Sequence, residues 1–194
     1  MNSIKIWHPT KKIKATVQVP GSKSESNRVL VLNALSGNRI TSENLSPARD
    51  TVNLQKILQS SDAIIDVVDA GTSMRFLPSY YAASNQAKTI TGTDRMQERP
   101  IGPMVNALSE IGFDIRYKNK EGFPPVEIAP LKGLDKLDNE VSIEGNISSQ
   151  FITSLLLIAP FLPNGLKVNF TTELTSKPYI EMTLAILGHF GVSY

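Results

Sequence analysis

Apolar residues recur three and four positions apart in three segments of the chain, which is the spacing of one face of an amphipathic helix. The predicted inward faces are formed by Leu54, Ile57 and Leu58, by Val105, Leu108 and Ile111, and by Ile180, Leu184 and Leu187. Because all three faces need cover from water, we expect the three helices to pack on a common core.

Each of these helices ends a longer unit with the same layout. A helix opened by small polar residues comes first, followed by a Gly or Asn turn, a β-like stretch, a polar loop that carries Pro, and the amphipathic helix. The units span residues 26–58, 73–113 and 148–191. Three internal copies of one αβα layout predict a pseudo-symmetric α/β domain in which the copies pack side by side.

Further strands are expected outside these units. Residues 113–145 are rich in turn-forming and β-branched residues and predict paired strands, and residues 4–19 alternate loosely and predict two short strands. After the last unit, residues 192–194 read as the start of a strand. We therefore expect the last unit to be incomplete and the chain to be part of a longer polypeptide.

Composition narrows the possible chemistry. The 194 residues include no cysteine and only two distant histidines, so cysteine chemistry is excluded and a metal site is not expected; we interpret His8 and His189 as structural. The formal charge of +2 is evenly spread, which argues against a nucleic-acid surface. No apolar run could span a bilayer and the first residues lack the apolar region of a signal peptide, so we expect a cytoplasmic protein without membrane contact.

Three predicted helix N-termini carry similar polar groups. Unpaired backbone N–H groups and the helix dipole let such an end bind anions when nearby side chains help. Because the units are copies, we expect the three ends to converge on one surface. Their polar groups and glycines are Gly21, Ser22, Lys23, Ser24, Ser26 and Arg28 in the first, Gly71, Thr72, Ser73 and Arg75 in the second, and Ser148, Ser149 and Gln150 in the third.

The loops before the amphipathic helices add further polar groups. Arginine suits bidentate binding of carboxylate or phosphate. The candidates are Arg95 and Arg99 before Pro100, and Ser176, Lys177 and Tyr179 in the third unit.

Simpler interpretations of these residues stay open. Each serine cluster could act only as a helix N-cap, and Arg99 could pair with Asp94 or Glu98. A nucleotide-binding P-loop is excluded, because Ser22 stands where that motif needs a glycine before the lysine.

Five motifs, in order, resemble the EPSP synthase family of enolpyruvyl transferases: PGSKSESNR, AGTSMR, DRMQERPIG, SSQFITSLL and SKPYIEMTL. The resemblance covers residues 19–192. It implies two similar lobes, each an inside-out α/β barrel of three pseudo-threefold βαβαββ units. Residues 21–194 would form the N-terminal lobe, lacking its last strands, and residues 1–20 would form strands of the C-terminal lobe.

The resemblance also implies an activity without metal or cofactor. The enolpyruvyl group of phosphoenolpyruvate would pass to the 5-hydroxyl of shikimate 3-phosphate. Lys23 would be catalytic and touch both substrates, and Gln150 would lie between them. Shikimate 3-phosphate would contact Ser24, Arg28, Ser148, Ser149, Ser176 and Tyr179, and phosphoenolpyruvate, like the herbicide glyphosate, would contact Gly71 and Arg99.

Two alternatives to a complete enzyme of this kind stay open. In the family the carboxylates proposed as acid and base come from the C-terminal lobe, so this chain alone could bind substrate without turnover. A UDP-N-acetylglucosamine enolpyruvyl transferase shares the fold, but the motif KSESNR and the absence of cysteine argue against it.

The chain departs from the family pattern in three places. Asp69 stands where many relatives carry Asn, which would weaken an anion site if the carboxylate faced it. The segment 59–69 is shortened, and Phe76 replaces a proline, so herbicide response does not follow from the motif.

Overall fold

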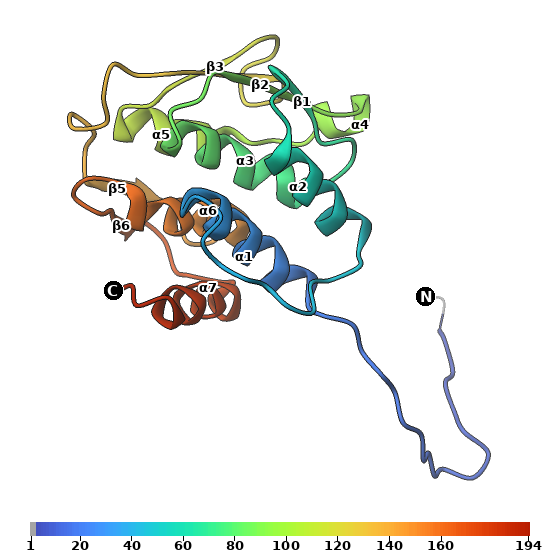
Figure 1. Cartoon of the computed structure of the whole chain (residues 1–194). Helices are drawn as coiled ribbons and strands as arrows, with labels where there is room; N and C mark the ends of the chain where they lie inside the picture. Colours follow the sequence, from blue (N-terminus) through green and yellow to red (C-terminus); the bar gives the residue numbers. More distant parts are fainter. Residues whose placement is uncertain (1–2) are drawn as a thin grey trace.

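The computed structural model describes residues 3–194 and shows a mixed α/β fold, as expected (Figure 1). Residues 64–129 run β1-α3-β2-α5-β3-β4, with the short helix α4 before α5, and so have the βαβαββ order, which extends beyond the predicted second unit at both ends. The elements are α1 (Lys23–Leu35), α2 (Arg49–Gln59), β1 (Ile64–Asp66), α3 (Gly71–Ala83), β2 (Lys88–Thr91), α4 (Asp94–Gln97), α5 (Gly102–Ile111), β3 (Asp114–Tyr117), β4 (Val126–Ala129), β5 (Glu140–Ile143), α6 (Ser149–Ile158), β6 (Lys167–Phe170) and α7 (Lys177–His189).

The first helices of the three units, α1, α3 and α6, form the centre of the molecule (Figure 1). Helix α3 is buried on all sides from Thr72 to Ala83, and α6 is buried over most of its length. A helix that is apolar or buried all round belongs to a core and not to a surface. The three helix N-termini therefore start from one shared core.

The strands form two separate sheets, and no closed barrel of strands forms among residues 3–194. In the four-stranded sheet, of order β1-β2-β4-β3, β1 and β2 are parallel and the other neighbours are antiparallel. The predicted pairing within residues 113–145 is confirmed for β3 and β4. Strand β5 instead pairs in parallel with β6 in the second sheet.

The second helices of the units pack on this core as the apolar spacing predicts. The inward residues of α5 are all buried, and Leu58 on α2 and Leu184 on α7 are partly buried against the core. Helix α5 ends at Gly112, whose φ of 108° places it in the left-handed region that glycine adopts without strain. The buried members of the three predicted faces are Leu54, Ile57, Val105, Leu108, Ile111, Ile180 and Leu187.

Two predicted β-like stretches do not form strands in the described structure. Residues 39–44 of the first unit lack regular structure, so the prediction of a β-like stretch there was wrong for this chain. Residues 3–20 are exposed and lead away from the body of the molecule (Figure 1). A strand needs a neighbour to pair its backbone groups, and neither stretch has one within residues 3–194. The assignment of residues 1–20 to another lobe stays a prediction, and residues 1 and 2 lie outside the described part.

None of the helices within residues 3–194 combines the length and the apolar character needed to cross a membrane.

Candidate anion-binding site

The N-termini of α1, α3 and α6 open into one cavity of about 480 Å³. The predicted convergence of these three helix ends on one surface is therefore confirmed. Its lining, called the three-helix cavity below, includes most of the predicted site residues and consists of Lys23, Ser24, Asn27, Arg28, Thr72, Arg75, Phe76, Arg99, Ser148, Ser149, Gln150 and Tyr179.

The three-helix cavity has a strongly positive lining. Four cationic side chains, Lys23, Arg28, Arg75 and Arg99, line it, and none of the lining residues in the described chain is a carboxylate. The positive ends of the helix dipoles add to this charge. Such a cavity favours a ligand that carries several negative charges.

Arg28 is only 3% exposed, and four of its five N–H donors are used inside the protein. Nε donates to Thr183 Oγ1 at 2.8 Å, and Nη1 donates to the Ser24 carbonyl at 2.8 Å. Nη2 donates to Thr153 Oγ1 at 3.1 Å and to the Tyr179 carbonyl at 3.4 Å. Burial lowers the pKa of the Arg28 guanidinium to about 10, which leaves it charged at neutral pH with one Nη1 N–H for a ligand.

Arg75 and Arg99 meet beside Gly71. A Cβ at Gly71 would stand 2.7 Å from Arg99 Nη1 and 3.0 Å from Arg75 Nη1, so both guanidinium groups border the space that glycine leaves. Arg75 Nη1 donates to the Gly71 carbonyl at 2.9 Å, while its buried Nε has no acceptor within residues 3–194. Burial and the neighbouring Arg99 charge lower the pKa of Arg75 to about 10. Like charges held together favour a bound anion.

Lys23 forms an ion pair with Asp50 on α2, with 3.0 Å between Nζ and Oδ2. The lysine side chain is 49% exposed, and such a pair adds little to stability in water. An ammonium group has three donors, so two remain for a ligand.

Gln150 and Ser148 organise the third helix end. Ser148 Oγ accepts a hydrogen bond from the Gln150 backbone N–H at 3.4 Å and so acts as the N-cap of α6. The Gln150 side chain donates from Nε2 to Thr72 Oγ1 at 3.1 Å and thereby joins α6 to α3. Ser148 is therefore a cap and a lining residue at once, so the two interpretations of this serine are compatible.

Two of the residues that the family resemblance assigns to the substrates, Gly71 and Ser176, do not line the three-helix cavity. Ser176 stands at the N-cap position of α7 without a side-chain cap bond, and its carbonyl accepts from the Tyr179 N–H at 3.2 Å. Gly71 lies beside the cavity, and the guanidinium groups of Arg75 and Arg99 border the space where its side chain would stand.

Three local expectations differ from the structure. Thr72 and Ser73 do not cap α3, which begins after Ala70 with no side-chain cap bond, so its first N–H groups stay open. Gly21, included among the groups of the first helix end, does not line the three-helix cavity but packs closely against the Asn44 carbonyl, which an added Cβ would meet. No ion pair within residues 3–194 joins Arg99 to a neighbouring acid.

Four lining residues were not among the predicted ligand contacts: Asn27, Thr72, Arg75 and Phe76. Thr72 and Arg75 were predicted among the polar groups of the second helix end, although not as ligand contacts, and comparison of the units would have indicated Arg75 as one. Arg28 and Arg75 each donate to the carbonyl four residues earlier, at Ser24 and Gly71, and so occupy equivalent positions in their helices. Asn27 gave no such signal, because its bond from Thr51 Oγ1 at 2.7 Å depends on the packing of α1 against α2.

Asp69 lies outside the three-helix cavity. Its carboxylate pairs with Arg49 at 3.4 Å on the surface, where both side chains are exposed. Asp69 does line an adjoining hollow of about 250 Å³ with Arg95 and Arg99. Because Arg99 also lines the three-helix cavity, the weakening of the anion site by this carboxylate stays a prediction.

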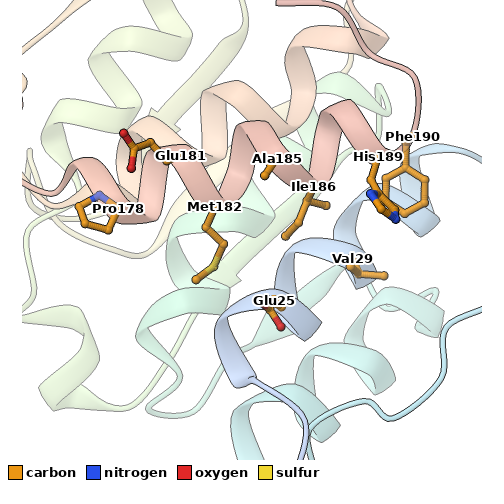
Figure 2. A pocket seen from close by; sticks show the side chains of 9 residues that line it. All are labelled: Glu25, Val29, Pro178, Glu181, Met182, Ala185, Ile186, His189 and Phe190. Carbon is orange, nitrogen blue, oxygen red and sulfur yellow. The ribbon is translucent and has the colours of Figure 1, made fainter.

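A second hollow of about 590 Å³ runs between α1 and α7 (Figure 2). Its lining is mostly apolar, as at Met182 and Ile186, and its charged lining residues, Glu25 and Glu181, are acids. His189 also lines it and is exposed near the C-terminal end of α7. The groove lacks the positive charge that an anion needs and contains none of the predicted site residues.

Comparison with known proteins identifies relatives of the chain. The family model described as EPSP synthase (3-phosphoshikimate 1-carboxyvinyltransferase) matches residues 7–60 and 52–193. A curated 3-phosphoshikimate 1-carboxyvinyltransferase from Bacteroides fragilis is 47% identical over 93% of this chain and 43% of its own length. That of Shewanella halifaxensis is 35% identical over 99% of this chain and 50% of its own length.

Solved structures show the same fold. EPSP synthase from Acinetobacter baumannii matches with a TM-score of 0.71 and 19% identity over 91% of this chain and 44% of that chain. The chain thus spans about half the length of the curated relatives it matches.

Proposed function

Because the chain belongs to the EPSP synthase family, we propose that it forms the shikimate 3-phosphate-binding lobe of an enolpyruvyl transferase. In this proposal the complete protein transfers the enolpyruvyl group of phosphoenolpyruvate to the 5-hydroxyl of shikimate 3-phosphate and releases phosphate. The reaction takes place in the cytoplasm, between this lobe and a C-terminal lobe of the same enzyme.

The positive lining of the three-helix cavity carries the proposal. Each substrate has a carboxylate and a phosphate group, and each needs several charge-assisted hydrogen bonds to leave water. Lysine and arginine side chains, serine hydroxyls and open helix N-termini supply such donors, with no lining carboxylate in the described chain to oppose them.

The two substrates are assigned to different parts of the three-helix cavity. Shikimate 3-phosphate contacts the α1, α6 and α7 side, where Arg28 donates hydrogen bonds to the carbonyls of Ser24 and Tyr179. Phosphoenolpyruvate lies beside Gly71, between the two guanidinium groups that meet there. Lys23, with two free donors, reaches both. Ser148, Ser149, Ser176 and Gln150 complete the shikimate 3-phosphate side, as the family resemblance implies.

The chemistry needs both charge and proton transfer. The 5-oxygen attacks C2 of phosphoenolpyruvate while its proton leaves and another proton adds to the methylene carbon, which gives a tetrahedral intermediate. Loss of phosphate and of a methyl proton restores the double bond. In this chain the fixed positive charges stabilise the anionic intermediate, and the acid and base come from the C-terminal lobe.

Calorimetry tests this proposal. The chain is titrated with shikimate 3-phosphate, with and without phosphoenolpyruvate, and with UDP-N-acetylglucosamine as a ligand that shares the anionic character. We expect heat of binding from shikimate 3-phosphate at up to millimolar concentration and none from the sugar nucleotide. A folded chain that ignores shikimate 3-phosphate, or prefers UDP-N-acetylglucosamine, contradicts the assignment.

A further inference from the structure

Two buried threonines, Thr153 on α6 and Thr183 on α7, hold the guanidinium group of Arg28. Both threonines are 0% exposed and neither lines the three-helix cavity. The Oγ1 atom of Thr153 accepts from Nη2 at 3.1 Å, and that of Thr183 accepts from Nε at 2.8 Å. Because Arg28 belongs to α1, three helices are joined at this point.

The direction of the hydrogen bonds follows from the single proton of a hydroxyl group. Thr183 Oγ1 donates its proton to the Tyr179 carbonyl at 2.8 Å. Its contact with Thr153 Oγ1, at 3.3 Å, then requires Thr153 to donate. Thr183 thus accepts from Arg28 and Thr153 and donates to Tyr179, which uses its full capacity, and such chains of hydrogen bonds strengthen one another.

This network fixes three cavity residues relative to one another. Arg28 donates through Nη1 to the Ser24 carbonyl, and the Tyr179 carbonyl receives both the Thr183 hydroxyl and Arg28 Nη2. Without the Thr183 hydroxyl, the buried Nε of Arg28 would lose its acceptor. The Tyr179 carbonyl would lose the shorter of its two side-chain bonds and keep the contact of 3.4 Å with Arg28 Nη2. Leaving a buried charged donor unpaired is costly, so Arg28 would turn to another acceptor.

We propose that Thr183 is a positioning residue, which holds Arg28 and Tyr179 in the arrangement that binds shikimate 3-phosphate. The inference rests on the proposed function for the identity of the ligand, and on the hydrogen bonds alone for the positioning. Thr183 does not touch the ligand. It directs the remaining Nη1 N–H of Arg28 and joins this guanidinium group to the Tyr179 carbonyl, in the first turn of α7.

Variants of the two threonines test this role. Thr183→Val keeps the shape but removes the hydroxyl, and Thr183→Ser keeps the hydroxyl. Thr153→Val removes the Nη2 acceptor and the donor to Thr183, but leaves the Nε acceptor in place. Ser154→Ala is the matched control, because its buried Oγ donates to the Phe151 carbonyl at 2.7 Å within the same helix and makes no bond to Arg28. The two measurements are calorimetric affinity for shikimate 3-phosphate and exchange of the Arg28 Nε–H with solvent by NMR.

A slowly exchanging Arg28 Nε–H is expected in the unmodified chain and in the variants Thr183→Ser and Ser154→Ala. These three proteins should bind shikimate 3-phosphate with equal affinity. Thr183→Val should lose the protected signal and bind shikimate 3-phosphate about tenfold more weakly, the effect of one hydrogen bond to a charged group. Thr153→Val should keep the protected Nε–H and bind several-fold more weakly. Thr183→Val with a protected Nε–H and unchanged affinity overturns the proposal.

The two proposals can fail separately. If the unmodified chain does not bind shikimate 3-phosphate, the proposed function fails, and the Arg28 signal in Thr183→Val alone decides the positioning role. If Thr183→Val does not fold, Thr153→Val takes its place, and unchanged affinity in that variant counts against the inference.

Discussion

Lys23 is proposed to bind substrate but should contribute little to the free energy of unfolding. Its ion pair with Asp50 joins two partly exposed side chains, and Lys23 lines the three-helix cavity. An exposed pair of this kind contributes about 0–1 kcal/mol. Binding and stability should therefore separate at this position.

Lys23→Ala should lower the affinity for shikimate 3-phosphate at least about tenfold while the free energy of unfolding falls by less than about 1 kcal/mol. Calorimetry and urea unfolding of the same sample measure the two effects. Asp50→Asn is the control, since it breaks the ion pair but keeps the lysine and should preserve binding. A large loss of stability in Lys23→Ala would instead indicate a structural lysine.

Arg75 should show the opposite balance. Its guanidinium is buried, lacks an acid partner within residues 3–194 and lies beside Arg99. Replacing an unfavourable buried charge by an apolar side chain of similar volume is often stabilising. Arg75→Met should therefore raise the free energy of unfolding by about 1 kcal/mol without ligand, as measured in urea, whereas Arg75→Lys, which keeps the charge, should not. Equal or lower stability of the Met variant would show that the guanidinium is already compensated.

At the scale of elements, the start of α1 depends on a close backbone contact. Helix α1 begins at Lys23, with Ser22 Oγ accepting from the Glu25 N–H at 3.3 Å, and the preceding Gly21 packs against the 44–46 backbone. That contact positions the first turn of α1, which carries the motif SKSESNR.

Gly21→Ala should destabilise the chain by about 1–3 kcal/mol, because the new Cβ would clash with the Asn44 carbonyl and the backbone would have to move. Gly102→Ala is the matched control: it lies at the start of α5, and its nearest neighbour atom is 3.7 Å away. It should be neutral or slightly stabilising. Thermal melting of both variants measures the difference in stability. Equal melting temperatures would mean that residues 44–46 move away from the new Cβ at no cost in stability.

At the scale of the whole molecule, the N-terminal residues differ from the rest. Residues 3–20 are exposed, and they include large apolar side chains such as Ile4, Ile6 and Trp7. Exposed apolar residues at this density are typical of a surface that a partner covers. Residues 3–20 should therefore contribute to assembly with the C-terminal lobe and not to the stability of residues 21–194.

We expect this chain alone to release no phosphate from shikimate 3-phosphate and phosphoenolpyruvate in a coupled assay. Mixing it with the C-terminal lobe of the Bacteroides fragilis relative should restore turnover. A shortened chain that starts at Pro20 should melt at the same temperature as the full chain, but its mixture with that lobe should show no turnover. Turnover by the chain alone would contradict the need for a second lobe, and full rescue by the shortened chain would contradict the role of residues 1–20.

Local patterns in the sequence were sufficient to predict the helices and the polar groups at their N-termini. Helical spacing alone marked inward residues such as Leu108 and Leu187, because burial of one helix face is a property of a few consecutive turns. Small polar residues marked the helix N-termini for the same reason: caps and dipoles act within one turn. The repeated layout of the units then predicted that these ends would converge.

Only the tertiary structure decided what each of these residues contacts. Thr153 and Thr183 bind Arg28 across 125 and 155 residues of sequence. The meeting of Arg75 with Arg99 at Gly71 joins helix α3 to the loop between α4 and α5. The unpaired state of residues 39–44 likewise depends on which strands lie nearby. Such contacts arise from packing between distant segments, which no local spacing encodes, whereas the helices and their polar ends are encoded turn by turn.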